Sequence, residues 1–335
     1  MKIKTLKKYA GGMALLTLLG VLPASCIKDD TAAVKETTLT LTVATRAGET
    51  VGNNEMDANE QMKTLRVIVA RSSNNEILYN EYRDEIDDNA SQYVFNFGEL
   101  TIEESEDFDF YAIANEASLD LRGSGITSLE EVTNTDLTAL KNCIINRDYN
   151  EIVEGNPLQI PQTAFKTIPV GAGEKKTATI QLEFVVAKIS VTFTNQTGNS
   201  LYIDGLSIED IKPDRGFLFD PNGAEISTVV MPENTTCTAV NGSERIWVGT
   251  NQPTTVKAYI YPTVKDDQNA FVLKANGYED LELNREDGSH LTSLDRGEWL
   301  RINITLIPKV TEVYPDIEWE VVDWSSSEVE VPSFE

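Results

Sequence analysis

The sequence predicts an all-β protein built mainly from antiparallel strands. Short runs of alternating apolar and polar residues recur from Thr37 to the C-terminal end, with turn-forming residues between them. Helical periodicity is scarce: one short helix is expected, at Ser128–Leu140, with Ser128 as its cap and two glutamates in its first turn. Short strands at this spacing favour two tandem β-sandwich domains over an α/β enzyme with a parallel sheet.

The first residues are expected to be a targeting signal. Four lysines precede an apolar run, Met13–Leu22, which is too short to span a bilayer permanently. The next residues, LPASC, end in Cys26 and resemble the lipobox of bacterial lipoproteins, with Pro23 as a departure. Residues 1–25 are therefore expected to be a lipoprotein signal peptide and Cys26 to be lipidated, which would hold the precursor on the outer membrane. The alternative is an ordinary secretory signal with a chance cysteine.

The stretch Thr37–Arg46, TTLTLTVATR, is expected to be a half-buried strand because its residues alternate strictly. Leu39, Leu41 and Val43 share one face, and threonines occupy the other. We expect this strand to complete a sheet in the precursor and to be removed by a protease that cuts between Arg46 and Ala47. Residues 26–46 would then be a propeptide, and the vacant sheet edge would accept a strand from another copy of the chain.

Arg46 has a second interpretation, as one surface arginine among others. The loop that follows it, residues 47–59, is poor in apolar residues, which favours a segment open to a protease.

The remaining chain is expected to form an N-terminal domain, residues 47–173, and a C-terminal domain, residues 174–335. Proline and glycine in Pro169–Glu174 indicate a linker between them. Alternation returns at the end of the chain, where residues 317–335 are expected to contain a donor strand. Within it, the apolar residues expected to fill the partner's pockets are Val329, Val331 and Phe334.

Composition excludes several classes of function. The chain has 335 residues and a formal net charge of −26. So acidic a surface repels nucleic acid, and no nucleic-acid partner is expected. With a single histidine, His290, a zinc site or a Ser-His-Asp arrangement is improbable, so no catalytic residue, metal or other cofactor is expected. Cys143 and Cys237 are expected to be buried free thiols, although sequence leaves a disulfide between them open.

Two further patterns allow a functional and a structural interpretation. The acidic runs Asp84–Asp88 and Glu103–Asp107 lack the spacing and the central glycine of a calcium loop, so solvated surface is favoured. The four tryptophans could form a sugar-binding platform, but tryptophans in strands more commonly pack in a core. These four residues are Trp247, Trp299, Trp319 and Trp324.

Several motifs together resemble one family. They are the lipoprotein signal, the sequence Thr45–Ala47 after an alternating strand, and four later segments: Phe110–Glu116, Leu182–Val191, Tyr259–Pro262 and Leu294–Ile304. In this order they resemble the Bacteroidales fimbrillins, the FimA-like subunits of type V pili. The resemblance implies two transthyretin-like β-sandwich domains, surface export as a lipoprotein, and removal of the first strand by an arginine-specific protease. It also implies assembly by strand exchange. Leu300 departs from the family, where we expect a Trp-Tyr pair.

The expected function is therefore structural and not enzymatic. The chain is expected to be a subunit of a fimbrium at the cell surface, with other copies of itself, related subunits and an adhesion receptor as partners. Two alternatives remain. One is a monomeric surface lipoprotein that binds a glycan or a host protein, and the other is a pilus anchor subunit that keeps its lipid.

Overall fold

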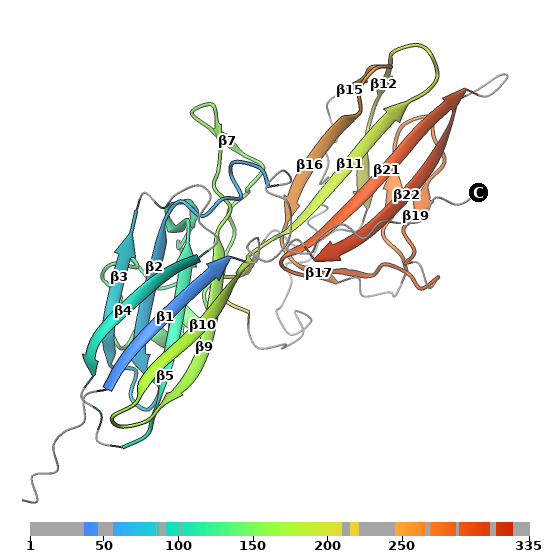
Figure 1. Cartoon of the computed structure of the whole chain (residues 1–335). Coiled ribbons are helices and arrows are strands. Elements are labelled where there is room, and N and C mark those ends of the chain that lie inside the picture. Colours follow the sequence, from blue (N-terminus) through green and yellow to red (C-terminus); the bar gives the residue numbers. More distant parts are fainter. Residues whose placement is uncertain are drawn as a thin grey trace, which may run out of the picture. The chain divides into compact units, whose positions relative to one another are not determined.

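A computed structural model describes residues 37–45, 56–84, 86, 92–100, 102, 104–209, 215–220, 245–264, 269–285, 288–308 and 313–323 (Figure 1). Over these residues the fold is almost entirely β, as expected. No helix in this part of the chain is long and apolar enough to cross a membrane. Cys26, Arg46, Ala47, Cys237, Trp324 and the expected donor residues Val329, Val331 and Phe334 lie outside the described residues.

The first sheet has seven strands in the order β3-β2-β5-β9-β10-β1-β4. Their bounds are β1 Thr37–Thr45, β2 Leu65–Arg71, β3 Ile77–Arg83, β4 Gln92–Leu100, β5 Glu106–Ala114, β9 Gln162–Val170 and β10 Lys175–Phe184. β10 pairs with β9 only through Glu183 and Phe184, whereas its earlier residues pair with β1. The sheet therefore folds over at β10, and its two halves enclose one apolar core, to which β1, β2, β4, β5, β9 and β10 all contribute.

The second sheet has four strands in the order β16-β11-β21-β22. They are β11 Ala187–Asn195, β16 Thr254–Ile260, β21 Glu298–Pro308 and β22 Val313–Asp323. Short strands supply the other side of its core: β12 Leu201–Ile203, β13 Ser207–Glu209, β15 Ile246–Val248, β18 Val272–Lys274 and β19 Leu281–Glu282. The part of the expected donor segment up to Asp323 is thus paired with β21 in its own sheet.

Smaller elements complete the described fold. They are the 3-10 helix η2 Glu116–Ser118, the helix α1 Leu137–Lys141, and strands β6 Ile144–Ile145, β7 Ile152–Val153, β8 Asn156–Pro157, β14 Gly216–Phe217, β17 Thr263–Val264 and β20 Ser293–Leu294. A third apolar cluster covers the outer face of β2 and β5, so residues on both faces of these strands are buried.

The prediction of a helix at Ser128–Leu140 is wrong over most of that range, since only Leu137–Lys141 is helical. Tertiary contacts hold the preceding residues in turns. The side chain of Asn80 donates to the carbonyl of Leu129 at 2.9 Å, and the Asp136 carboxylate accepts a hydrogen bond from the Thr133 amide at 2.8 Å. Side chains that bond the backbone in this way compete with helical hydrogen bonds.

The prediction of a linker between domains at Pro169–Glu174 is also wrong. Pro169 and Val170 end β9, and the next residues form the tight turn into β10. The Glu174 amide donates to the carbonyl of Gly171 at 3.0 Å, and the Glu174 carboxylate accepts from the Gly171 amide at 2.8 Å. The chain passes from the first sheet to the second later, at Val185 and Val186, between β10 and β11.

Candidate assembly site

The alternating strand β1, which we expect to be exchangeable, lies inside the first sheet, between β10 and β4. It pairs in parallel with β10, from Thr38 opposite Lys175 to Thr45 opposite Leu182. On its other side it pairs antiparallel with β4. The open edge expected for the vacated sheet is therefore a slot with two sides, because β10 returns from a distant part of the sequence to flank β1.

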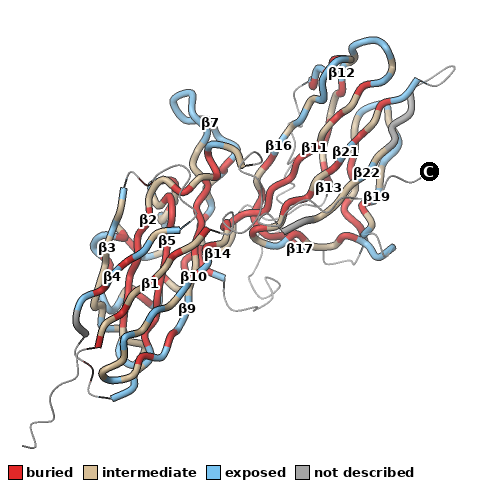
Figure 2. Tube along the Cα trace, in the orientation of Figure 1, coloured by how far each residue is buried: buried red, intermediate tan, exposed pale blue. Residues whose placement is uncertain are grey.

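The burial pattern of β1 follows its sequence alternation. Leu39, Leu41 and Val43 are 0% exposed and belong to the core of the first sheet, and the residues between them are partly exposed (Figure 2). Phe95 and Phe97 of β4 lie in the same core, with their rings stacked at 5.9 Å. β1 therefore fills three consecutive inward positions between β4 and β10.

The first residues of β1 are tied to the turn between β9 and β10. The Thr38 amide donates to the carbonyl of Glu174 at 3.0 Å, and the Thr37 hydroxyl accepts from the Gly173 amide at 2.8 Å. Hydrogen bonds from the Gly171 amide and Lys176 lower the pKa of the Glu174 carboxyl. These contacts fix the register of β1 at its N-terminal end.

β4 depends on β1 for its place in the sheet. Among the strands that the structure describes, β4 pairs with β1 alone. Without β1, the backbone groups of β4 and of β10 that face the slot would lack partners, which is costly for buried groups. A strand in the place of β1 would therefore have to pair with two neighbours at once.

The segment that follows the expected cleavage site is anchored by a buried ion pair. The Lys188 ammonium on β11 lies 2.6 Å from the Glu60 carboxylate, and both side chains are fully buried. The Tyr259 hydroxyl on β16 donates to the same carboxylate at 2.6 Å. The loop expected to be open to a protease, residues 47–59, thus ends at a buried residue, Asn59, next to the buried Glu60.

Further charges surround this pair. Asp57 lies 3.1 Å from Lys188 and 2.5 Å from Lys257. Burial raises the pKa of Glu60 despite the nearby Lys188 charge. Burial acts in the same direction on Asp57, but its hydrogen bond from Lys257 and the Lys188 charge outweigh that effect and lower its pKa. Lys188 also lies 4.3 Å from the centroid of the Trp299 ring, so its charge contacts an aromatic face as well.

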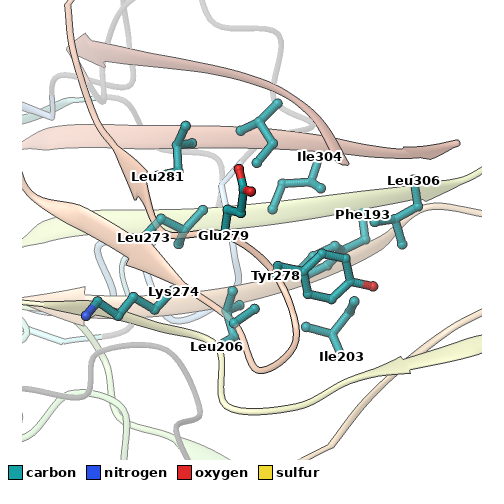
Figure 3. A pocket seen from close by; sticks show the side chains of 12 residues that line it. Phe193, Ile203, Leu206, Leu273, Lys274, Tyr278, Glu279, Leu281, Ile304 and Leu306 are labelled. Carbon is teal, nitrogen blue, oxygen red and sulfur yellow. The ribbon is translucent and has the colours of Figure 1, made fainter. Parts of the chain in front are cut away.

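The cleft shown in Figure 3 is lined mainly by apolar side chains of the second core, including Phe193, Leu206 and Ile304. Its volume is about 30 Å³, the room of one or two water molecules. Lys274, at its rim, is paired with Glu209 and Asp280. The cleft is too small to hold an organic ligand as it stands.

The other sequence candidates fall in separate places. Among the described residues, no group of three or more His, Cys, Asp or Glu side chains could hold a metal ion. Glu106, from one of the acidic runs, pairs with Arg71. Cys143 is a buried free thiol. Trp299 packs in the core at 9% exposure, whereas Trp247 is 55% exposed, contrary to the expectation of core packing.

No protein-family model and no curated protein matches the sequence. Several solved structures resemble the fold, and two of them serve as examples. The tip fimbrial protein Mfa3 from Porphyromonas gingivalis, with a C-terminal truncation, has a TM-score of 0.53 and 13% identity, over 86% of this chain and 100% of that one. A candidate cell adhesion protein from Bacteroides eggerthii has a TM-score of 0.50 and 12% identity, over 87% and 97%. The chain therefore has a fimbrillin-like fold, shared with these fimbrial and adhesion proteins.

We expect Leu41→Ala to lower the free energy of unfolding by about 2–5 kcal/mol, because it removes a fully buried side chain from β1. Urea denaturation of the precursor measures the change. Thr42→Ala is the matched control on the outward face of the same strand, with an expected change within about 0.5 kcal/mol. Equal effects of the two substitutions would contradict the inward orientation of Leu41.

We expect Lys188→Met to destabilise the protein by about 3–5 kcal/mol, because it leaves Glu60 buried without its cation. Lys257→Met removes a partly exposed partner of Asp57 and should cost no more than about 1 kcal/mol. Chemical denaturation at pH 7 compares the two. If the double variant Lys188→Met/Glu60→Leu is as unstable as Lys188→Met, the unpaired carboxylate is not the cause.

Proposed function

We propose that the chain is a subunit of a cell-surface fimbrium that assembles by β-strand exchange and supports adhesion. It is exported as a lipoprotein precursor with lipid on Cys26, and an arginine-specific protease then cuts it between Arg46 and Ala47. A strand from another subunit replaces β1. The likeness of the fold to fimbrial and adhesion proteins supports a pilus or adhesin role at the cell surface.

The observation that carries the proposal is the position of β1. This strand precedes residues 46–55 in the sequence and lies between β10 and the edge strand β4 in the first sheet. A cut at Arg46 would remove its covalent connection to the rest of the sheet. Only the two ladders and the buried face of β1 would then retain it, and both can be reproduced by a strand of similar sequence.

The geometry of the slot sets the requirements for a donor strand. The donor runs parallel to β10 and antiparallel to β4, and it carries apolar residues at alternate positions. In the segment 324–335, Val329 and Val331 have the same parity and can occupy two neighbouring inward positions. Phe334 has the opposite parity. Phe334 can reach the same face only if the donor strand contains a β-bulge, which adds one residue. Pro332 favours a bulge between Val331 and Phe334, because proline has no N–H group to donate to a ladder.

The energetics favour a stable junction with slow exchange. Burying each of three apolar side chains contributes roughly 1.5–3 kcal/mol. Each backbone hydrogen bond of the two ladders adds roughly 0.5–1.5 kcal/mol. The cut alone therefore leaves β1 bound, and its release requires displacement by the incoming strand. The segment around Glu60 stays covalently attached to the subunit after the cut, and Lys188 and Tyr259 hold it in place.

A cysteine pair across β1 and β4 tests the exchange directly. Thr42 lies opposite Val94 in the antiparallel ladder, within disulfide distance for such a pair. We expect the variant Thr42→Cys/Val94→Cys to be cleaved after Arg46 but to form no oligomers until a reductant is added. Detergent-resistant ladders on gels measure assembly, and each single variant is the control. Oligomers that form equally well with the disulfide intact would contradict the release of β1.

Arg46→Ala should abolish processing and keep the chain monomeric. The N-terminal sequence of protein taken from the cell surface is expected to begin at Ala47 in the wild type, and the variant should keep β1. Arg83→Ala removes another partly exposed arginine, in β3, and should be processed normally. Mature wild-type protein that still carries lipid at Cys26 would support an anchor subunit instead.

A further inference from the structure

Two aromatic side chains lie exposed beside each other on the second part of the fold. Tyr202 on β12 is directly opposite Trp247 on β15 in an antiparallel ladder. They are 54% and 55% exposed. Side chains directly opposite in such a ladder are on the same face, with Cβ atoms about 5 Å apart. The two exposed aromatic side chains therefore lie on the same face of this ladder, and we name the pair the Tyr202–Trp247 platform.

Both rings are supported from one side. The Trp247 ring lies against Gly249: a Cβ atom at this glycine would come within 2.7 Å of the Trp247 ring. The Arg245 guanidinium carbon lies 4.7 Å from the centroid of the Tyr202 ring. Aromatic side chains have only two χ angles, so rings supported in this way lose little conformational entropy when a ligand binds. The platform is prepared for contact before any ligand arrives.

Polar groups border the platform. The Arg245 Nε atom donates to Asp204 Oδ1 at 2.8 Å, and a second guanidinium nitrogen lies 3.3 Å from Oδ2. Both side chains remain substantially exposed. Their remaining donors and acceptors are available next to the Tyr202 ring, and the two charges neutralise each other locally.

These properties define the chemistry of a ligand. A pyranose ring has a face of C–H groups that stacks on an aromatic plane, and hydroxyl groups around its rim that bond to carboxylate and guanidinium. An anionic ligand is disfavoured, since Arg245 is already paired and the chain carries a net charge of −26. We propose that the Tyr202–Trp247 platform binds neutral carbohydrate. This names the ligand class for the proposed adhesion role and rests on that role for its purpose, although the binding itself requires no filament.

The test measures carbohydrate binding by the full-length precursor before any cleavage. The probes are an immobilised set of neutral hexasaccharides of glucose, mannose, xylose and N-acetylglucosamine, with sialylated and sulfated oligosaccharides as anionic counterparts. We expect the wild type to retain at least one neutral probe. Trp247→Ala should weaken that binding about tenfold or more, corresponding to about 1.4 kcal/mol. Trp247→Phe, which keeps an aromatic face, should lose less.

Tyr82→Ala is the matched control. Tyr82 is 37% exposed and also has an arginine near its ring: the guanidinium carbon of Arg66 lies 5.0 Å from the ring centroid. The residue opposite it in the ladder is Arg66, so it lacks an exposed aromatic neighbour across the strands. We expect Tyr82→Ala to bind the neutral probe like the wild type. Circular dichroism and thermal unfolding verify that all variants fold.

Three outcomes overturn the inference. They are retention of no neutral probe at millimolar concentration, retention of anionic probes only, and equal binding by Trp247→Ala and the wild type. Loss of filaments in Trp247→Ala without any carbohydrate binding would assign the platform to a contact between subunits instead. Failure of strand exchange is measured separately by the cysteine pair in β1 and β4. A precursor that binds carbohydrate but never polymerises would refute the filament and leave the platform in place.

Discussion

The first sheet depends on the two backbone ladders of β1. One ladder joins this strand to β10 in parallel and the other joins it to β4, which has no second partner strand among those described. The buried side chains Leu39, Leu41 and Val43 add a continuous apolar face. Any process that removes β1 must therefore supply an equivalent strand, or two neighbouring strands lose their hydrogen bonds together.

In the proposed assembly, the buried Lys188–Glu60 pair separates the part of the chain that would be exchanged from the part that would remain. Residues before it include β1, whereas the segment at Glu60 is held against β11 and β16. A buried pair of this kind gives little net stability, but either partner alone is strongly destabilising. The pair thus specifies where the segment after the proposed cleavage site lies.

Local patterns predicted the all-β fold and the alternation of β1, because a period of two over Thr37–Thr45 is visible in the sequence itself. Long-range partners were not visible. The place of β1 next to β10 depends on a pairing across more than a hundred residues. The helix expected from Ser128 does not form over most of its length, because the Asn80 side chain bonds the backbone of that segment. Lys188 offers a partial signal, since a lysine inside an apolar strand requires a buried anion, but nothing in the sequence identifies Glu60. The exposed pair at Tyr202 and Trp247 depends likewise on the pairing of two distant three-residue strands.

The pairing of β1 on both sides has a mechanical consequence for a fibre assembled as proposed. A strand pulled along its own length loads all the bonds of its two ladders simultaneously, in shear. If a strand were paired on one side only and pulled perpendicular to its length, its hydrogen bonds would instead break one after another. Where flow over the cell surface pulls the exchanged strand along its own length, the two ladders would share the load.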